Sequence, residues 1–289
     1  MPGQVEHNDP FIRRVTDCSE RYVMVKDADL NICAASGGKD SPALLVAMSE
    51  LFPGRVRALT FNPHIPEYSD TNLSNLRALC DSRNIALTEV SLKEKHDVTL
   101  SELRDRLGSS APTYCTICGV LKRYYLNLYA RREGATIIAT GHNMDDVVQS
   151  HLMNILRGTP SASARLGPIS GVTKDSRFIR RVKPLMMIAE HEILGYVHEL
   201  GVLVDTSPCP YSGDAYRRTV KEALDRYEKA SPGMHERVLG RFLSDLGRLQ
   251  ALCSTGEAPA ACTICGEPCQ QDICSACHLL KKAGLLERC

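Results

Sequence analysis

The chain has 289 residues, of which 24% are charged, and a net charge of +1 at pH 7. This length suffices for one large domain or two modest ones, and no apolar run approaches the ~20 residues that a membrane-spanning helix needs. The polar first nine residues do not have the pattern of a signal peptide, so we expect a cytoplasmic protein without a membrane partner.

Short apolar runs alternate with helical patterns through the first half of the chain. This alternation predicts an α/β fold with a doubly wound parallel sheet, whose ligand lies beyond the carboxyl ends of the strands. The expected strands are residues 30–35, 56–61, 85–90 and 136–140. The expected helices are residues 42–51, 68–84, 100–107, 118–133 and 143–156.

The second half of the chain has a different pattern. Residues 167–183 predict a loop with a short strand pair, residues 189–200 a helix, and residues 213–252 a charged helical segment. Residues 254–259 have the composition of a linker. Six cysteines among residues 261–289 indicate a separate small module.

The sequence SGGKDS (residues 36–41) leaves the first expected strand and enters a helix. Glycines let the backbone approach an anion, and a helix N-terminus supplies free N–H groups. A Walker A loop is excluded because Asp40 follows Lys39 where that loop has Ser or Thr. SGGKDS resembles the PP-loop of ATP pyrophosphatases, which bind the pyrophosphate end of ATP and transfer AMP. The alternative is an incidental Gly-Gly turn.

Three cysteines form a second candidate site. Cys115 and Cys118 form a CxxC pair, and Cys209 lies between two prolines. A CxxC pair is typical of half a zinc site, a redox pair or cluster ligands, and no second CxxC follows until Cys262. Three cysteines that hold a cubane leave one iron open for a sulfur donor. A zinc site, unliganded thiols and persulfide chemistry are the alternatives.

Four segments carry a more specific resemblance: residues 115–130, 139–158, 180–185 (RRVKPL) and 207–212 (SPCPYS). Together they resemble the tRNA 2-thiouridine synthetases, which thiolate T-loop or wobble uridines. The resemblance extends from about residue 11 to residue 278. It implies a sulfurtransferase that adenylates the 2-oxygen of a tRNA uridine and replaces it with sulfur at a [4Fe-4S] cluster on Cys115, Cys118 and Cys209.

The same resemblance assigns the remaining site residues. Lys122 and Asp146 are expected to assist adenylation, with Mg²⁺ beside the ATP. Without the resemblance, Lys122 is a solvated lysine, and Asp146 is part of a helix cap whose N-cap is Asn143. The residues expected to bind ATP are Ala34, Ala35, Ser36, Gly37, Gly38, Lys39, Asp40, Ser41, Gly141 and His142.

The cysteine spacing near the C-terminus predicts a structural Zn²⁺ site. Cys262, Cys265, Cys274 and Cys277 form two CxxC pairs in a segment too short to fold on its own core. Cys269 and Cys289 are surplus to this site. We therefore expect residues 30–252 to form the PP-loop ATP-binding catalytic domain with a helical extension, and residues 260–289 a C-terminal zinc finger.

The chain departs from the family pattern at its N-terminus, and its sequence does not determine its oligomeric state or its sulfur donor. Residues 1–29 form a lead-in segment without the CxxC of the family's N-terminal zinc finger. The resemblance suggests a homodimer and a sulfur donor that is either sulfide or a thiocarboxylated ubiquitin-like protein.

The rival functions are an amide-forming ATP pyrophosphatase and a zinc-dependent RNA-binding protein with a decayed PP-loop. Three basic clusters are candidate RNA contacts or solvated faces, at residues 123–132, 180–183 and 217–221.

Overall fold

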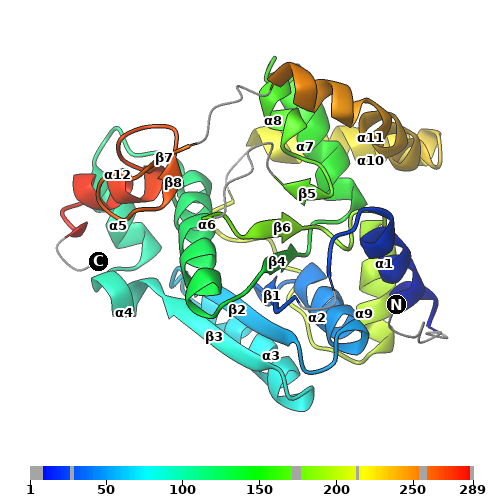
Figure 1. Cartoon of the computed structure of the whole chain (residues 1–289), viewed down its shortest axis with the longest axis horizontal. Coiled ribbons are helices and arrows are strands. Elements are labelled where there is room, and N and C mark those ends of the chain that lie inside the picture. Colours follow the sequence, from blue (N-terminus) through cyan, green and yellow to red (C-terminus); the bar gives the residue numbers. More distant parts are fainter. Residues whose placement is uncertain (1–8, 27–28, 171–176, 213–214, 254–258, 287–289) are drawn as a thin grey trace.

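The computed structural model describes residues 9–26, 29–170, 177–212, 215–253 and 259–286. Its central sheet contains β1 (Asn31–Ala34), β2 (Val56–Asn62), β3 (Ala86–Ser91), β4 (Ile137–Thr140), β5 (Ile169–Ser170) and β6 (Arg180–Val182). The strand order is β3-β2-β1-β4-β6-β5 (Figure 1), and all pairs are parallel except β5 against β6. The predicted doubly wound α/β sheet is confirmed, including the short antiparallel pair.

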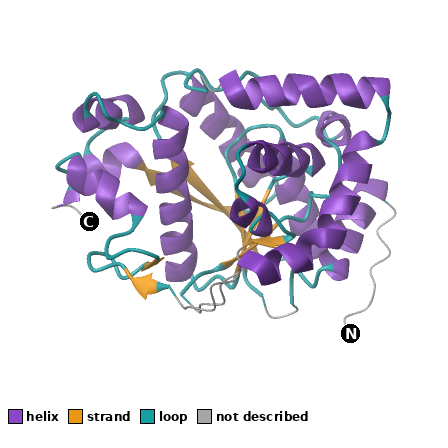
Figure 2. Ribbon diagram, turned by 90° about the horizontal axis from the view of Figure 1, so that it is seen from above, coloured by secondary structure: helices purple, strands orange, loops and turns teal. Residues whose placement is uncertain are grey.

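Helices cover both sides of this sheet (Figure 2). The helices before β4 are α1 (Pro10–Arg21), α2 (Asp40–Leu51), α3 (Tyr68–Ser82), α4 (Leu92–His96), α5 (Leu100–Leu107) and α6 (Tyr114–Arg132). Those after it are α7 (Met144–Leu156), α8 (Pro160–Ala164), α9 (Glu190–Glu199), α10 (Ala215–Ala230), α11 (Met234–Cys253) and α12 (Ser275–Lys282).

Two hydrophobic clusters, one on each side of the sheet, hold these layers together. In β1 the buried Ile32 faces the cluster of α5, α6 and α12, while its neighbour Cys33 faces the cluster of α1, α2 and α9. Such alternation is required of a strand that is covered on both faces. Cys18, Cys33 and Cys80 are buried, as expected of small core residues.

The structure corrects several predicted boundaries. Helix α6 begins at Tyr114 instead of residue 118, because Thr113 caps it by accepting a hydrogen bond from the Thr116 N–H. The segment 213–252 contains two helices, since Pro232 and Gly233 stand between α10 and α11. Helix α1 lies within the predicted lead-in, where Phe11 stacks on Tyr196 at 3.9 Å between ring centroids.

The C-terminal segment packs against the sheet layers as well as on itself. It consists of the two-stranded pair β7 (Ala260–Ala261) and β8 (Pro268–Cys269), followed by α12. Leu279 and Leu280 of α12 belong to the same hydrophobic cluster as Ile117 and Leu121 of α6. Residues 1–8, residues 254–258 of the predicted linker, and Cys289 lie outside the described residues. In the part of the chain that is described, no helix is both long and apolar enough to cross a membrane.

Candidate active site

The carboxyl ends of β1 and β4 position the phosphate loop. These two strands are neighbours at the point where the strand order reverses, which is where open α/β sheets bind ligands. Residues 35–39 follow β1 and lead into α2. The Ser41 hydroxyl accepts hydrogen bonds from the N–H groups of Ser36 (3.3 Å) and Gly37 (3.1 Å) and donates one to the Gly38 carbonyl (3.1 Å). Ser41 therefore shapes the loop from inside.

Gly37 fits this loop because it lacks a side chain. Its φ is +76°, a left-handed conformation that favours glycine. A Cβ at this position would lie 2.1 Å from the backbone oxygen of Asn72 in α3. Gly141, which follows β4, packs similarly: its Cβ would lie 3.2 Å from the Asp40 Cβ. The two loops are thus in contact at the sheet edge.

A network of charges surrounds Lys39. Its ammonium group lies 2.7 Å from an Asp40 carboxylate oxygen and 2.8 Å from a Glu190 carboxylate oxygen. The Asn143 side-chain amide donates a 3.0 Å hydrogen bond to Asp40. Burial raises the pKa of Asp40 despite the attraction of Lys39, and the nearby charge of Asp146 raises it further. Lys39 is thus paired with two carboxylates at the start of α2.

Asp146 lies in the first turn of α7, where Asn143 is the N-cap as predicted: its side-chain oxygen accepts the Asp146 N–H at 2.9 Å. The Asp146 carboxylate accepts a 3.1 Å hydrogen bond from Arg217 of α10. Burial raises the pKa of Asp146, and Arg217 and Lys39 oppose this shift. The neighbouring Asp145 carboxylate instead accepts the Glu190 N–H at 2.8 Å.

His142 follows β4 at the carboxyl edge of the sheet. Its side chain is exposed, and its Nδ1 lies 2.9 Å from the Thr140 hydroxyl. Partial desolvation, together with the positive charges of Lys183 and Arg217, lowers the pKa of His142 to about 4.

The structure brings the three predicted cysteines together in one cavity of about 310 Å³. Cys115 and Cys118 enter it from the start of α6, and Cys209 enters it from the loop before α10. Ser36 of the phosphate loop and Lys122 of α6 line the same cavity. The cavity therefore joins the phosphate loop to the cysteine triad.

Two contacts hold the Cys209 loop across the cavity. Asp205 forms a parallel backbone bridge with Gly38 of the phosphate loop. Tyr211 stacks on Tyr114 with 4.3 Å between ring centroids, and its carbonyl lies 3.7 Å from the Cys115 sulfur. Burial raises the pKa of the Cys118 thiol, and the Lys122 charge one helical turn away opposes this shift. Metal ligation as a thiolate would overcome the burial effect.

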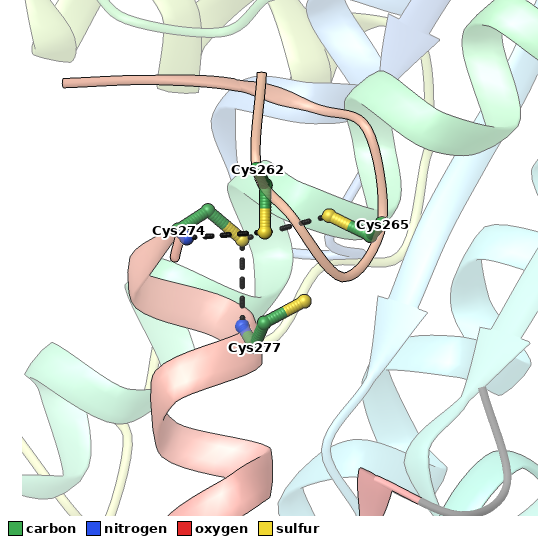
Figure 3. Close-up of side chains that lie close together, drawn as sticks. All are labelled: Cys262, Cys265, Cys274 and Cys277. Carbon is green, nitrogen blue, oxygen red and sulfur yellow. Dashed lines mark hydrogen bonds between the residues drawn. The ribbon is translucent and has the colours of Figure 1, made fainter. Parts of the chain in front are cut away.

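The C-terminal cysteines form a tighter group (Figure 3). The ligand sulfurs of Cys262, Cys265, Cys274 and Cys277 all lie within 4.8 Å of one another. The Cys265 and Cys274 sulfurs are 3.7 Å apart, close to the ~3.8 Å edge of a tetrahedron with Zn–S bonds of about 2.3 Å. The Cys274 N–H donates to the Cys262 sulfur at 3.3 Å, and hydrogen bonds of this kind lower the pKa of Cys262 to about 6. The donor set fits a structural Zn²⁺ ion.

In the part of the chain that is described, the C-terminal four are the group of ligand atoms close enough together to hold a single metal ion.

Sequence reasoning did not identify four residues around the site. Glu190 and Arg217 pair with the predicted Lys39 and Asp146, while Asp205 and Tyr211 fix the Cys209 loop. All four come from segments distant in sequence from their partners. Arg217 was noted only as part of a basic cluster, and Glu190 had no local signal beyond its place at a helix start.

Comparison with known proteins agrees with this geometry. Residues 10–209 match the family of PP-loop domains. The chain is 32% identical to a tRNA-5-methyluridine(54) 2-sulfurtransferase of Thermus thermophilus, over 94% of this chain and 82% of the relative. It is 32% identical to cytoplasmic tRNA 2-thiolation protein 1 of Drosophila melanogaster, over 86% of this chain and 72% of the relative.

A solved structure of a tRNA thiolase is also similar to this chain. The U34-tRNA thiolase NcsA from Methanococcus maripaludis, which holds a [4Fe-4S] cluster, superposes with a TM-score of 0.77 and 28% identity, over 94% of this chain and 86% of that protein. The fold, the phosphate loop and these relatives lead to one conclusion: the chain belongs to the PP-loop family, in its tRNA 2-sulfurtransferase group.

Proposed function

We propose that this protein is an ATP-dependent tRNA-uridine 2-sulfurtransferase. The observation that carries the proposal is the shared cavity, because Ser36 of the phosphate loop and all three cysteines line it. An activated base bound there would be in reach of both the nucleotide and a sulfur site. The names of the T. thermophilus relative and of NcsA supply the substrate class, a tRNA uridine.

The phosphate loop accounts for the activation step. Residues 34–41 bind the pyrophosphate end of ATP. The Lys39 ammonium group, which pairs with Asp40 and Glu190 in the free protein, then also contacts the phosphates. Asp40 and Asp146 are the carboxylates that would hold Mg²⁺, an ion that prefers oxygen ligands. The uridine 2-oxygen attacks the α-phosphorus of ATP, and pyrophosphate leaves. Gly141 and His142 close the nucleotide side of the site.

The cysteine side accounts for the sulfur step. Cys115, Cys118 and Cys209 line one cavity and would hold a [4Fe-4S] cluster, which would supply an iron without a protein ligand for an external sulfide. Lys122 lies one helical turn from Cys118 and faces the cavity, where its charge stabilises negative charge that develops on the base. Sulfide attacks the activated carbon of the uridine, and AMP leaves with the former 2-oxygen.

The remaining parts of the proposal concern assembly. Residues 30–252 would form the catalytic unit, and residues 260–289 a zinc finger that packs on α6. A homodimer is the expected assembly, and sulfide or a thiocarboxylated ubiquitin-like protein the expected donor. Persulfide chemistry on the same thiols is the second candidate mechanism, because Cys115 and Cys118 are neighbours on one helix turn.

The test is an anaerobic thiolation assay with tRNA transcripts, ATP and sulfide, followed by nucleoside mass spectrometry. We expect 2-thiouridine with wild type and with the control Cys253→Ala, a cysteine on α11 outside the cavity, and none with Cys209→Ala. Transcripts with cytidine at position 34 or position 54 identify the target base. Turnover of ATP without thiolation of any transcript would refute the proposal and favour the amide-forming rival.

A further inference from the structure

Several cations of the three basic clusters have partners within the protein. Arg217 pairs with Asp146, Lys221 with Glu190, and Arg131 with Glu267 at 2.5 Å. Lys183 is buried and donates hydrogen bonds of 2.8 Å to the carbonyls of Leu166 and Gly167. These residues hold the fold and the site together, so they are poor candidates for RNA contacts.

Arg123 and Arg181 differ from these residues. Among the described residues, no acidic side chain forms an ion pair with either guanidinium group. Glu267 is the carboxylate that interacts electrostatically with Arg181, but it already pairs with Arg131 and accepts a 2.5 Å hydrogen bond from Asn127. The positive charge of the two arginines is thus largely uncompensated.

The two arginines are in contact with each other, and Arg123 reaches toward the cavity. Arg181 of β6 donates a 3.0 Å hydrogen bond to the Arg123 carbonyl of α6, and the two elements are neighbours in Figure 1. The Arg123 guanidinium folds back over Gly119, where a Cβ would lie 3.5 Å from its Nη1. Gly119 lines the cavity next to Cys118. The guanidinium therefore flanks the cavity wall, one residue along α6 from Lys122.

Such an arrangement is unfavourable in the free protein. Burial, followed by the repulsion of Arg123, lowers the pKa of Arg181 to about 10, whereas the Arg123 side chain is exposed and open to an external ligand. Two neighbouring guanidinium groups of like charge are stabilised by an anion that accepts hydrogen bonds from both. A phosphodiester has two unesterified oxygens and suits a pair of guanidinium groups.

We propose that Arg123 and Arg181 bind a backbone phosphate of the tRNA next to the target uridine, an inference that rests on the proposed function. A base in the cavity must be turned out of its stack, and a phosphate held at the rim fixes the backbone beside it. The pair thus selects a polynucleotide over a free nucleoside, whereas the phosphates of ATP bind at residues 34–41.

The test measures binding of an unmodified tRNA transcript to the anaerobic full-length protein by fluorescence anisotropy at several salt concentrations. The variants are Arg123→Gln, Arg181→Gln and the matched control Arg57→Gln. Arg57 is an exposed arginine at the amino end of β2, on the sheet edge opposite the cavity. ATP affinity and iron content are measured on the same samples.

We expect each site variant to bind tRNA about tenfold more weakly and the salt slope to fall by roughly 0.7–0.9 for each lost phosphate contact. The control, ATP affinity and iron content should match wild type. Weaker ATP binding with unchanged tRNA binding would show that the two arginines contact ATP. Loss of iron would show that they support Cys118 as a cluster ligand. Either result overturns the inference. If the wild type thiolates tRNA and both variants bind tRNA as tightly as the wild type, this inference alone is refuted. If the wild type binds no tRNA, the proposed function is refuted too.

Discussion

Gly37→Ala is the substitution whose effect can be worked out most directly from the structure. The new Cβ would lie 2.1 Å from the Asn72 carbonyl oxygen, and side chains in folded proteins essentially never approach closer than 3.0 Å. The loop or α3 must therefore move by about 0.9 Å, the difference between these two distances. Alanine at a φ of +76° adds about 1–2 kcal/mol of backbone strain.

Two control glycines separate these effects. Gly54 has a φ of +71° with nothing within 4 Å of a Cβ, so Gly54→Ala measures the backbone strain alone. Gly38 lies in the same loop without a positive φ, and its Cβ would meet only the Ser36 hydroxyl at 3.7 Å. We expect losses of unfolding free energy of less than about 1 kcal/mol for Gly38→Ala and about 1–2 kcal/mol for Gly54→Ala.

For Gly37→Ala the overlap adds a further ~1–3 kcal/mol, which gives a total of about 2–5 kcal/mol and a Tm lower by roughly 4 °C or more. A shift of this size also takes the loop N–H groups out of hydrogen-bonding range, so ATP affinity should fall at least about tenfold. Thermal unfolding and calorimetric ATP titration measure both effects. A Gly37→Ala variant with the Tm of Gly54→Ala and wild-type ATP affinity would refute the described loop geometry.

Three further predictions concern the other parts of the site. Lys122→Met should lower thiolation about a hundredfold in single-turnover assays while the iron content is retained, since Lys122 acts on the base rather than as a ligand. Burial raises the pKa of Asp146, so its carboxylate destabilises the fold above that raised pKa and ceases to do so as the pH falls through it. Asp146→Asn should therefore raise Tm at pH 7.5, with the gain vanishing toward pH 4, while thiolation is lost; a gain that grows on acidification would contradict this sign. Cys277→Ser should remove one zinc ion per chain, measured by atomic emission, and lower stability by at least about 4 kcal/mol, because the metal group and α6 share one hydrophobic cluster; a zinc-free variant with wild-type Tm would contradict this.

Local patterns predicted much of the fold. The apolar runs around Ile32 and Ile138 and the Gly-Gly loop between strand and helix specify a parallel sheet with a phosphate loop. Asn143 was recognisable as an N-cap because Asn is preferred directly before a helix. In the structure its side chain accepts the N–H three residues away, as this position requires. The two C-terminal CxxC pairs predicted a metal site whose four sulfurs the structure brings together.

Long-range contacts were not predictable in this way. Helix α1 was missed although its start has local signals, since Asp9 caps it and Pro10 is its first residue; its stacking of Phe11 on Tyr196 was not predictable. The pairing of Lys39 with Glu190 joins residues far apart in sequence, and neither has a local pattern that names the other. Cys118 and Cys209 are likewise far apart in sequence, so their spacing does not reveal the cavity that they share.

We propose that Cys115, Cys118 and Cys209 hold a [4Fe-4S] cluster in the cavity beside the phosphate loop. The most direct test of this proposal is the anaerobic visible absorption spectrum, with iron and sulfide content, of wild type, Cys209→Ala and the control Cys253→Ala. We expect a broad iron–sulfur charge-transfer band with four irons per chain in wild type and control, and a weakened band with less iron in Cys209→Ala. A colourless wild-type protein that holds only zinc after anaerobic reconstitution would contradict the proposal.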